Sequence, residues 1–519
     1  MKGHWSGSHR GGNNSSLYLP IHAKFPVRIL FLIIIALLAG ILITVWNVYQ
    51  LRAMQESHMT GFHSKVEAVG GSDTSKPVYW IHAKRLESGY LDHIIRVFER
   101  IGYSRGGPDS EWDVLWTHDY PFTELSMAIE RMEKHQKLNH FPGMGFITQK
   151  VQLATSNVEF VPRAYKMPQE KDQFLAEASE NKEKLWVQKS NAHRGIKVKP
   201  VAELDLNAAN SFIQEFVRNP FLIDGRKFDI GIYTVVTSIN PLRVYIVDDE
   251  TLVRFCGKDY LPEDFNDVNK YVVTDDYTPM WLMPSFEKLF NQQHFSFKES
   301  LNSYIRSKGM DSSKINSQVY SAIRSVFLNK HPQLLKALNK YQHKNVFFEL
   351  MRFDFVLDEF LNLYLMEVNM SPNLSSNHFM PNKFLYEHVI FNILSVAGVA
   401  RNVPRSLKKG PEDARTMEVS EKDILVKSDV CGSSQCITCV SSECQLCFKC
   451  LVPDQIAMLK ESYYEHIHRQ STRRVYPEPM SQDEALHYDT TKDSSLTPND
   501  RVLREWFRAR CREDIYWCT

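Results

Sequence analysis

The stretch Phe348–Ser371, FELMRFDFVLDEFLNLYLMEVNMS, constrains the fold of this chain more than any other segment. It contains two runs rich in aromatic and branched apolar residues, Phe353–Leu357 and Leu363–Val368, with the short turn-like segment Asp358–Asn362 between them. Two such runs around a short connection predict a β-hairpin. The chain of 519 residues has room for two or three domains, and this hairpin places a β-sheet in one of them.

Three oxygen-bearing side chains mark the hairpin. Asp354 lies in the first run, and Glu367 and Asn369 end the second, although neither Glu nor Asn is a good strand former. Across so short a turn the three side chains can converge at one end of the sheet. Two carboxylates and an amide oxygen suit Mg²⁺, which keeps waters and nucleotide phosphates as its other ligands. An ordinary hairpin with exposed acids fits the same residues, so both interpretations stay open.

The hairpin resembles the end of the ATP-grasp domain in the tubulin tyrosine ligase-like family, where a FD…LxEVNxSP pattern holds magnesium. The resemblance extends over Trp112–Leu374, about half of the chain, and five further segments follow in the family's order. These segments are Glu111–Phe122, Asn139–Lys150, Leu185–Ile196, Phe212–Tyr233 and Pro241–Phe255. The resemblance implies an α/β fold of the α+β kind, an ATP-grasp domain preceded by a small α/β lobe.

The resemblance also implies a reaction. The chain is similar to ATP- and Mg²⁺-dependent carboxylate–amine ligases, in which ATP phosphorylates a side-chain carboxylate and an incoming amine attacks the acyl phosphate. In this chemistry a protein mainly positions the reactants and neutralises phosphate charge. We expect glutamate as the amino acid and tubulin as the implied acceptor. The alternatives are a nucleotide-binding pseudoenzyme that acts as a membrane-anchored binding module, and a ligase for a lumenal acceptor other than tubulin.

Matching the family's motifs residue by residue assigns roles. Lys189 would contact the phosphates, and it and Arg254 are the residues expected to act in catalysis. The metal ligands would be Asp354, Glu367 and Asn369. The nucleotide-binding residues implied in this way are Lys189, Arg194, Gly195, Ile196, Gln214, Glu215, Phe216, Val217, Lys227 and Asp229.

Two departures from the family pattern put activity in doubt. Gly231 stands where the family carries an arginine that is implied to hold the incoming carboxylate or the transferring phosphate, and glycine cannot replace a guanidinium. The phosphate loop around Gly195 is short and has a single glycine. Arg226 is a nearby candidate substitute. We expect weak or partner-dependent transfer that Gly231→Arg would raise, provided that the pocket has room.

The N-terminal segment predicts a membrane anchor. Ile29–Trp46 carries no charge over eighteen residues, which fits a membrane-spanning helix. Four Lys and Arg residues precede it and three follow it before residue 77, which favours a cytoplasmic N-terminus. The N-glycosylation sequons at Asn369 and Asn373 point the other way, because a lumenal domain would risk a glycan on a proposed metal ligand. The side of the membrane on which the domain lies stays open.

Local patterns suggest how the chain is organised. Val78–His82 and the stretch around Val114 predict strands on either side of an amphipathic helix, a βαβ start. We expect one helix near Ala208–Val217 among strands, and a helical hairpin over 314–340 that breaks at His331-Pro332. The predicted parts are a polar tail (1–28), a transmembrane helix (29–49), a stem (50–76), the ligase-like domain (77–402) and a Cys-rich region (403–519).

The last of these parts contains most of the cysteines. The net charge of the whole chain is +1, so no global field would draw it to nucleic acid. The cluster has CxxC spacings that suit structural zinc, yet an even number of cysteines also suits disulfides, with Cys511 and Cys518 as a further pair and Cys256 left over. Both alternatives stay open, and disulfides would fit an oxidising compartment. The clustered residues are Cys431, Cys436, Cys439, Cys444, Cys447 and Cys450.

Overall fold

The computed structural model divides the chain into two compact units, Met1–Asp73 and Thr74–Thr519. It describes residues 37–38, 40, 42–47, 50, 76–86, 89–191, 196–401, 418–426, 429–440, 444–488 and 496–519. The predicted membrane span therefore lies largely outside the described residues. Within the described part of the chain, no helix combines the length and the apolarity needed to cross a membrane.

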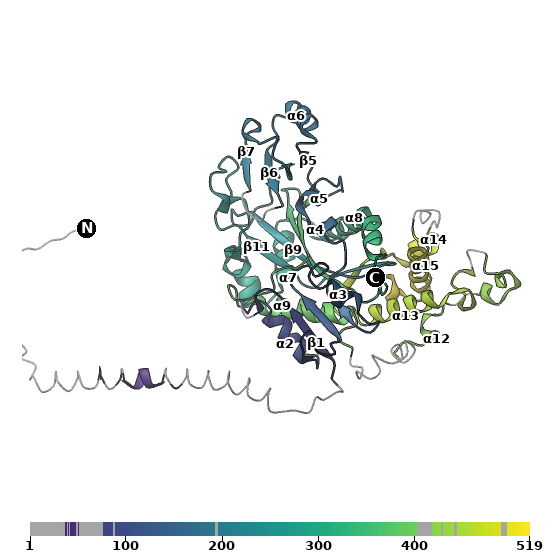
Figure 1. The fold of residues 1–519 in the computed structure, drawn as a ribbon. Coiled ribbons are helices and arrows are strands. Elements are labelled where there is room, and N and C mark those ends of the chain that lie inside the picture. The colour runs from purple at the N-terminus through teal and green to yellow at the C-terminus, as the bar shows by residue number, and fades with distance from the viewer. Residues whose placement is uncertain are drawn as a thin grey trace, which may run out of the picture. The chain divides into compact units, whose positions relative to one another are not determined.

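The second unit begins with a small parallel sheet (Figure 1). Strand β1 (Val78–His82) pairs in parallel with β2 (Ser104–Arg105) and with β3 (Val114–Thr117), and β3 pairs in the same sense with β4 (Lys137–Leu138). Helix α2 (Asp92–Arg100) connects β1 to β2 and buries one apolar face, as the spacing of three and four residues predicts. The predicted βαβ start is confirmed.

A second sheet forms the lobe at the top of Figure 1, in the order β5-β8-β6-β7. The helix predicted near Ala208–Val217 is wrong, because strand β8 (Ser211–Glu215) lies there, hydrogen-bonded to a neighbour on each side. A short buried apolar run has the same composition in a helix and in a strand, so periodicity cannot separate them. The other elements of this lobe are β5 (Ala164–Met167), α6 (Lys171–Glu180), β6 (Trp186–Ser190) and β7 (Lys197–Lys199).

The third sheet has seven strands and carries the main hydrophobic core. Its longest strand, β9, pairs along one edge with β13 and along the other with β11 and then β10. The strands are β9 (Phe228–Ile239), β10 (Leu242–Val247), β11 (Leu252–Phe255), β12 (Thr278–Pro279), β13 (Glu349–Leu357), β14 (Leu363–Asn369) and β15 (Thr472–Tyr476).

The predicted hairpin is confirmed as β13 and β14. The two strands are antiparallel, with Asp354 directly opposite Glu367 and Arg352 opposite Asn369. Strand β13 is buried along its whole length, although three charged residues, Glu349, Arg352 and Asp354, interrupt its apolar sequence. Strand β13 therefore lies inside the main sheet, between β9 and β14, whereas β14 pairs with β13 alone and is an edge strand.

Helix α8 (Ser313–Leu338) is continuous, so the predicted break at His331-Pro332 is wrong. Its buried residues recur every three or four positions along the whole helix and pack on the main core. Burial of that face on both sides of Pro332 outweighs the local cost of a proline in a helix. The neighbouring His331 ring also contacts the Ile239 carbonyl oxygen through Nε2 at 2.8 Å.

The remaining described helices complete the unit. They are α3 (Ser126–Glu130), α4 (Gly145–Thr148), α5 (Lys150–Ala154), α7 (Phe297–Ser307), α9 (Asn382–Val396), α12 (Glu421–Ile424), α13 (Pro453–Ile467), α14 (Gln482–His487) and α15 (Pro498–Glu513). Shorter 3-10 or π turns span Val201–Glu203, Val268–Lys270, Met280–Leu282, Pro284–Phe286, Glu287–Gln292, Asp429–Gly432, Ser434–Cys436, Phe448–Cys450 and Ile515–Cys518.

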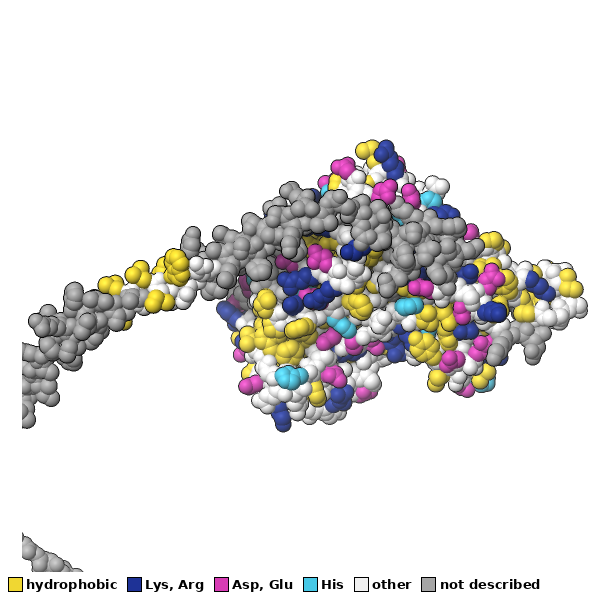
Figure 2. Space-filling view, turned by 90° about the horizontal axis from the view of Figure 1, so that it is seen from below, with side chains coloured by type: hydrophobic (Ala, Val, Ile, Leu, Met, Phe, Trp, Pro, Cys, Tyr) yellow, Lys and Arg dark blue, Asp and Glu magenta, His cyan; other side chains and the backbone are white. Residues whose placement is uncertain are grey.

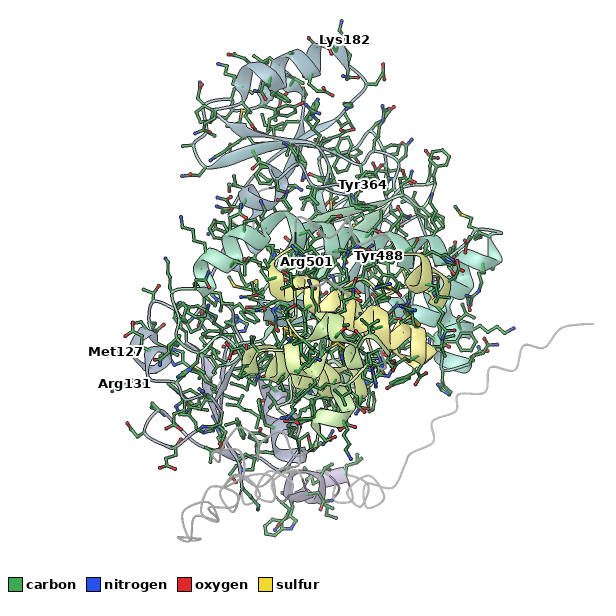
Figure 3. All side chains as sticks on the ribbon, turned by 90° about the vertical axis from the view of Figure 1, so that its right-hand side faces the viewer. Met127, Arg131, Lys182, Tyr364, Tyr488 and Arg501 are labelled. Carbon is green, nitrogen blue, oxygen red and sulfur yellow. A yellow bond between two sulfur atoms is a disulfide. The ribbon has the colours of Figure 1, made fainter. Side chains whose placement is uncertain are left out.

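The C-terminal residues fold onto the main sheet. Helices α13 and α15 build a core of their own around Leu459, Leu503 and Trp506, and Figure 3 shows α15 with Arg501 facing the viewer. Strand β15 pairs with β10 and so adds an edge strand to the main sheet. Figure 2 shows acidic and basic side chains interspersed over the visible described face, in agreement with the near-zero net charge.

The cysteines of this region form disulfides, the second of the two alternatives that the sequence left open. The single cysteine without a disulfide among the described residues is Cys256, which is buried. No group of three or more His, Cys, Asp or Glu side chains in the described part of the chain is arranged to hold a metal, and the alternative of a structural zinc site is not formed there. The bonds are Cys431–Cys447, Cys436–Cys444, Cys439–Cys450 and Cys511–Cys518.

Candidate active site

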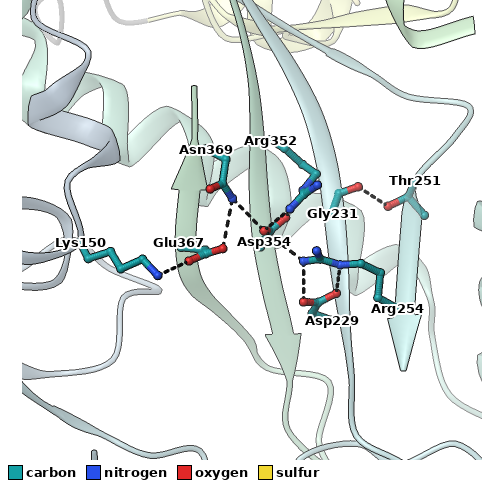
Figure 4. A network of polar contacts seen from close by, with 9 residues as sticks. All are labelled: Lys150, Asp229, Gly231, Thr251, Arg254, Arg352, Asp354, Glu367 and Asn369. Carbon is teal, nitrogen blue, oxygen red and sulfur yellow. Dashed lines mark hydrogen bonds and ion pairs between the residues drawn. The ribbon is translucent and has the colours of Figure 1, made fainter. Parts of the chain in front are cut away.

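Four neighbouring strands bring the predicted metal ligands together on one face of the main sheet (Figure 4). The strand order is β11, β9, β13, β14, and the register places Asp354 between Gly231 on β9 and Glu367 on β14. The amide nitrogen of Asn369 donates to Asp354 Oδ2 at 3.0 Å and to Glu367 Oε1 at 3.2 Å. All three predicted ligands therefore converge, as the hairpin pattern indicated.

Arginines neutralise the buried carboxylates of this face. Arg352 holds Asp354 through Nε to Oδ1 at 2.6 Å and Nη2 to Oδ2 at 2.8 Å. Arg254 holds Asp229 through two contacts of 2.9 and 2.7 Å, and its Nη2 also reaches Asp354 Oδ2 at 3.2 Å. Asp354 is only 2% exposed and Arg352 only 6%, so these pairs form away from water.

A lysine neutralises the third carboxylate. Lys150, at the start of α5, places Nζ 2.9 Å from Glu367 Oε2. Burial would raise the pKa of Glu367, but the Lys150 ammonium and the Asn369 amide outweigh it and lower that pKa to about 2. Three acids thus face three bases in what we call the charge-paired cluster. Its members are Lys150, Asp229, Arg254, Arg352, Asp354, Glu367 and Asn369.

The predicted phosphate-binding lysines lie next to this cluster, and we call Lys189 and Lys227 the lysine pair. Lys189 Nζ donates to Gln214 Oε1 at 2.9 Å, and Lys227 Nζ lies 4.6 Å from the centre of the Phe216 ring. Among the described residues neither ammonium forms an ion pair. Burial lowers the pKa of each lysine to about 8, and the charges of Lys227 and Lys150 lower that of Lys189 further. Among the described residues the positive charge of the lysine pair is offset only in part, by Glu367 near Lys189 and by Asp229 near Lys227.

The predicted adenine hinge lies at the end of β8. Gln214 is buried, and its side chain joins Lys189 to the Pro162 carbonyl oxygen, to which Nε2 donates at 3.1 Å. The Glu215 carboxylate pairs with Lys184 at 3.1 Å. The Phe216 ring packs edge-on against two other aromatic rings, and the backbone of Val217 follows directly after it. The two aromatic partners of Phe216 are Phe265 and Tyr271.

The predicted phosphate loop cannot be placed in the same way. Arg194 and Gly195 lie outside the described residues, whereas Ile196 is described and partly buried immediately before β7. Their proposed contacts with phosphate stay predictions.

Arg226, the substitute considered for the arginine missing at position 231, contacts other groups. Its Nη1 donates to Thr278 Oγ1 at 2.6 Å, and its Nε lies 3.4 Å from Asp259 Oδ1. Sequence reasoning missed Arg352 and Lys150 instead. The available signal for Arg352 was a charged residue inside an apolar strand, two positions before Asp354 and so on the same face.

The condition attached to Gly231→Arg is not met. A Cβ atom at Gly231 would lie 2.9 Å from Cδ of Arg352 and 3.3 Å from Oδ1 of Asp354. Since the space is filled, the expectation that this single substitution raises transfer has to be revised.

Comparisons with known proteins agree with this geometry. Residues 128–406, more than half of the chain, match the Tubulin-tyrosine ligase family. The probable tubulin polyglutamylase ttll-15 of Caenorhabditis elegans is 42% identical over 443 residues, which cover 83% of this chain and 84% of that protein. The tubulin polyglutamylase TTLL6 of Mus musculus is 27% identical over 315 residues, which cover 55% of this chain and 36% of that protein.

A further relative is named as a monoglutamylase and not as a polyglutamylase. The tubulin monoglutamylase TTLL4 of Mus musculus is 28% identical over 288 residues, which cover 52% of this chain and 24% of that protein. The mixed α/β fold and the match to ligases define a ligase-like protein. This chain belongs to the tubulin-tyrosine ligase family.

Proposed function

We propose that the protein is an ATP- and Mg²⁺-dependent ligase that joins glutamate to a side-chain carboxylate of a protein, with tubulin as the acceptor. Relatives named as tubulin polyglutamylases and monoglutamylases support the amino acid and the acceptor. The observation that carries the proposal is the lysine pair, two cations without ion partners among the described residues, beside a cluster of carboxylates. Such an arrangement suits a ligand with phosphates and a divalent cation.

The residues present fit both groups. Burial disfavours the charged form of Lys189 and Lys227, and an anion between them would restore it. Asp354 and Glu367 offer carboxylate oxygens within one small volume, the hard donors that Mg²⁺ takes, and Asn369, whose amide nitrogen faces them here, would have to turn its oxygen toward the ion. When bound, ATP would supply the phosphoryl group that activates the acceptor carboxylate.

The other site residues then have defined tasks. The hinge backbone at Glu215–Val217 would hold the adenine edge, with Phe216 beneath Lys227. Arg254 fixes Asp229 through two contacts, so that both side chains would keep their positions when the substrate binds. Arg194, Gly195 and Ile196 would close over the phosphates. The pseudoenzyme alternative depends on Gly231, because β9 carries no arginine at this position.

A second candidate is a ligase for an acceptor other than tubulin in an oxidising compartment. Four disulfides within residues 431–518 favour it, because disulfides are rare in reducing compartments. The predicted anchor at 29–49 and the charge bias around it would place the domain across the membrane. Thiol counting tests this candidate: native protein made in cells should show one thiol, Cys256, only after denaturation, and no stoichiometric zinc.

The proposed reaction is tested with isotope-labelled glutamate, purified full-length protein and tubulin. Transfer should require both ATP and Mg²⁺, and Lys189→Met should remove it. Lys258→Met, at an exposed lysine that pairs with Asp267, is the matched control and should transfer normally. Protein that binds Mg-ATP but transfers no glutamate to tubulin would contradict the tubulin proposal. Labelling of a lumenal protein in sealed microsomes would then favour the second candidate.

A further inference from the structure

Arg352 stands out among the cations of the charge-paired cluster. It comes from the middle of β13, a fully buried strand whose other charged residues are Glu349 and Asp354, and it is 6% exposed. Burying a charged side chain in a sheet is costly unless it is paired and hydrogen-bonded. Such a residue needs an explanation, either as support for the carboxylate that it holds or as part of the substrate site.

The neighbouring strand leaves room for this side chain. Gly231 on β9 lies opposite Asp354, and a Cβ there would meet Cδ and Nε of Arg352 at 2.9 and 3.3 Å. Real Cβ atoms do not approach a neighbour as closely as the shorter distance. The absence of a side chain on β9 and the presence of a long cationic one on β13 therefore belong together. The positive charge near position 231 is supplied from the next strand.

We propose that Arg352 binds the carboxylate of the incoming amino acid, and that Gly231 is the residue that makes room for it. This inference rests on the proposed ligase function. It turns the glycine from a sign of lost activity into half of a matched pair. The doubt that Gly231 cast on catalysis is thereby answered by a residue 121 positions further along the chain.

The chemistry of the guanidinium favours a carboxylate as its ligand. In this structure Nε and Nη2 already grip the two oxygens of Asp354, so the fork has the geometry of a carboxylate site. Asp354 is also a proposed metal ligand, and a carboxylate that shares its charge with a cation holds a guanidinium less strongly. Arg352 can then release Asp354 and bind the carboxylate of the incoming amino acid, so that its charge stays paired throughout.

The other cations of the cluster suit this task less well. Arg254 is held by both oxygens of Asp229, which is not a proposed metal ligand, and reaches Asp354 only through one longer contact of 3.2 Å, so its main pairing does not depend on the metal. Lys150 is a point charge paired with Glu367 and lacks the planar fork. Among these three bases, Arg352 has both a planar guanidinium and a main partner, Asp354, that would bind Mg²⁺ in the proposed site.

Four variants of the full-length protein test the inference: Arg352→Gly, Arg352→Lys, Gly231→Arg, and the exchange Gly231→Arg/Arg352→Gly. The KM for glutamate and the KM for ATP are measured separately, together with glutamate binding by calorimetry in the presence of a non-hydrolysable ATP analogue. Arg352→Gly should raise the KM for glutamate by about 10- to 100-fold, the value of a charge-assisted contact, and leave that for ATP within about twofold. Arg352→Lys should recover part of the loss.

The exchange variant separates this role from a structural one. Gly231→Arg alone should unfold at a lower temperature, because two side chains compete for one space. The exchange should recover both stability and glutamate affinity relative to either single change, a coupling that independent sites do not show. Thermal unfolding of every variant identifies those that fail to fold, and the exchange keeps the test valid if Arg352→Gly is among them.

Several results would overturn the inference. One is an Arg352→Gly protein with an unchanged KM for glutamate, and another is a loss of ATP affinity of the same size. A rise in the KM for glutamate in Arg226→Ala and not in Arg352→Gly would assign the role to Arg226 instead. Failure of the wild type to transfer glutamate to any acceptor would contradict the proposed function, and calorimetric glutamate binding would still decide the role of Arg352.

Discussion

The lysine pair and the charge-paired cluster are neighbours, yet they treat charge in opposite ways. Lys189 and Lys227 hold positive charge that burial opposes, and the nearby carboxylates Glu367 and Asp229 offset this effect only in part, without a direct ion pair among the described residues. In the cluster every acid faces a base within 3.0 Å. An anionic ligand at the lysine pair adds the negative charge that these side chains lack. A charged ligand at the charge-paired cluster must instead replace an acid or a base that is already paired. The two regions should therefore respond differently to the loss of a single charge.

The largest effect is expected from Asp354→Ala. This change leaves Arg352 without its main partner in a buried site, and breaking a buried ion pair costs about 3–5 kcal/mol. Chemical denaturation of the ligand-free protein measures the loss. Asp248→Ala, at a more exposed pair with Lys298, is the control and should cost less. An equal loss in both variants would show that the cluster is no more tightly paired than the surface.

The opposite result is expected at the lysine pair. Lys189→Met removes a charge that burial disfavours, so the ligand-free protein should be as stable as the wild type or more stable. Its affinity for ATP should fall by about 10- to 100-fold, because a charge-assisted contact with phosphate is lost. Calorimetric titration with a non-hydrolysable ATP analogue measures it. Marked destabilisation of the ligand-free variant would mean that Lys189 has an acidic partner in the protein beyond its contact with Gln214, and the contrast would fail.

The pH dependence of ATP binding sharpens the contrast. Both lysines have a folded-state pKa of about 8, below the ordinary value of 10.5. Between these values the unfolded chain binds more protons, so the ligand-free protein gains stability from these groups as the pH rises. Phosphates favour the charged form, so ATP affinity should fall about tenfold per lysine between pH 7 and pH 9. Titrations in buffers of different ionisation enthalpy should detect proton uptake at pH 8.5, and none would be seen if both lysines are already fully charged.

A smaller loss of stability than that of Asp354→Ala is expected from Glu367→Gln. The Glu367 carboxylate is 31% exposed, against 3% for that of Asp354, and it pairs with Lys150, so the loss of its charge leaves a less buried partner. The same change removes a proposed metal ligand and should abolish the Mg²⁺-dependent part of the protection that ATP gives against thermal unfolding. A Glu367→Gln protein that Mg-ATP protects as well as it protects the wild type would show that this residue is not a ligand.

Much of the site could be predicted from the sequence because it lies on one hairpin. The turn after Leu357 is short, which brings the two strands side by side, but an irregularity between Asp354 and Phe355 leaves Met366 unpaired and so places Asp354 opposite Glu367, a shift that the strand pattern did not predict. Arg352 was visible in that pattern as a charge in an apolar run, but its significance depends on Gly231. No local rule connects these two residues, because β9 and β13 become neighbours only when the sheet forms.

The wrong predictions have the same origin. The segment at β8 is a strand because β5 and β6 pair with it, and α8 continues through Pro332 because the core holds both of its halves. In each case tertiary contacts outweighed a local preference. The choice between zinc and disulfides likewise depended on which cysteines the backbone brings together.

The pairing of β15 with β10 has a consequence for any shortened form of this protein. A product that ended before Thr472 would keep every residue of the proposed active site, yet it would expose the backbone donors and acceptors of β10 along the edge of the main sheet. Unprotected edges of this kind recruit other strands and lead to aggregation. Shortened forms of the protein that stop near residue 402 should therefore be insoluble.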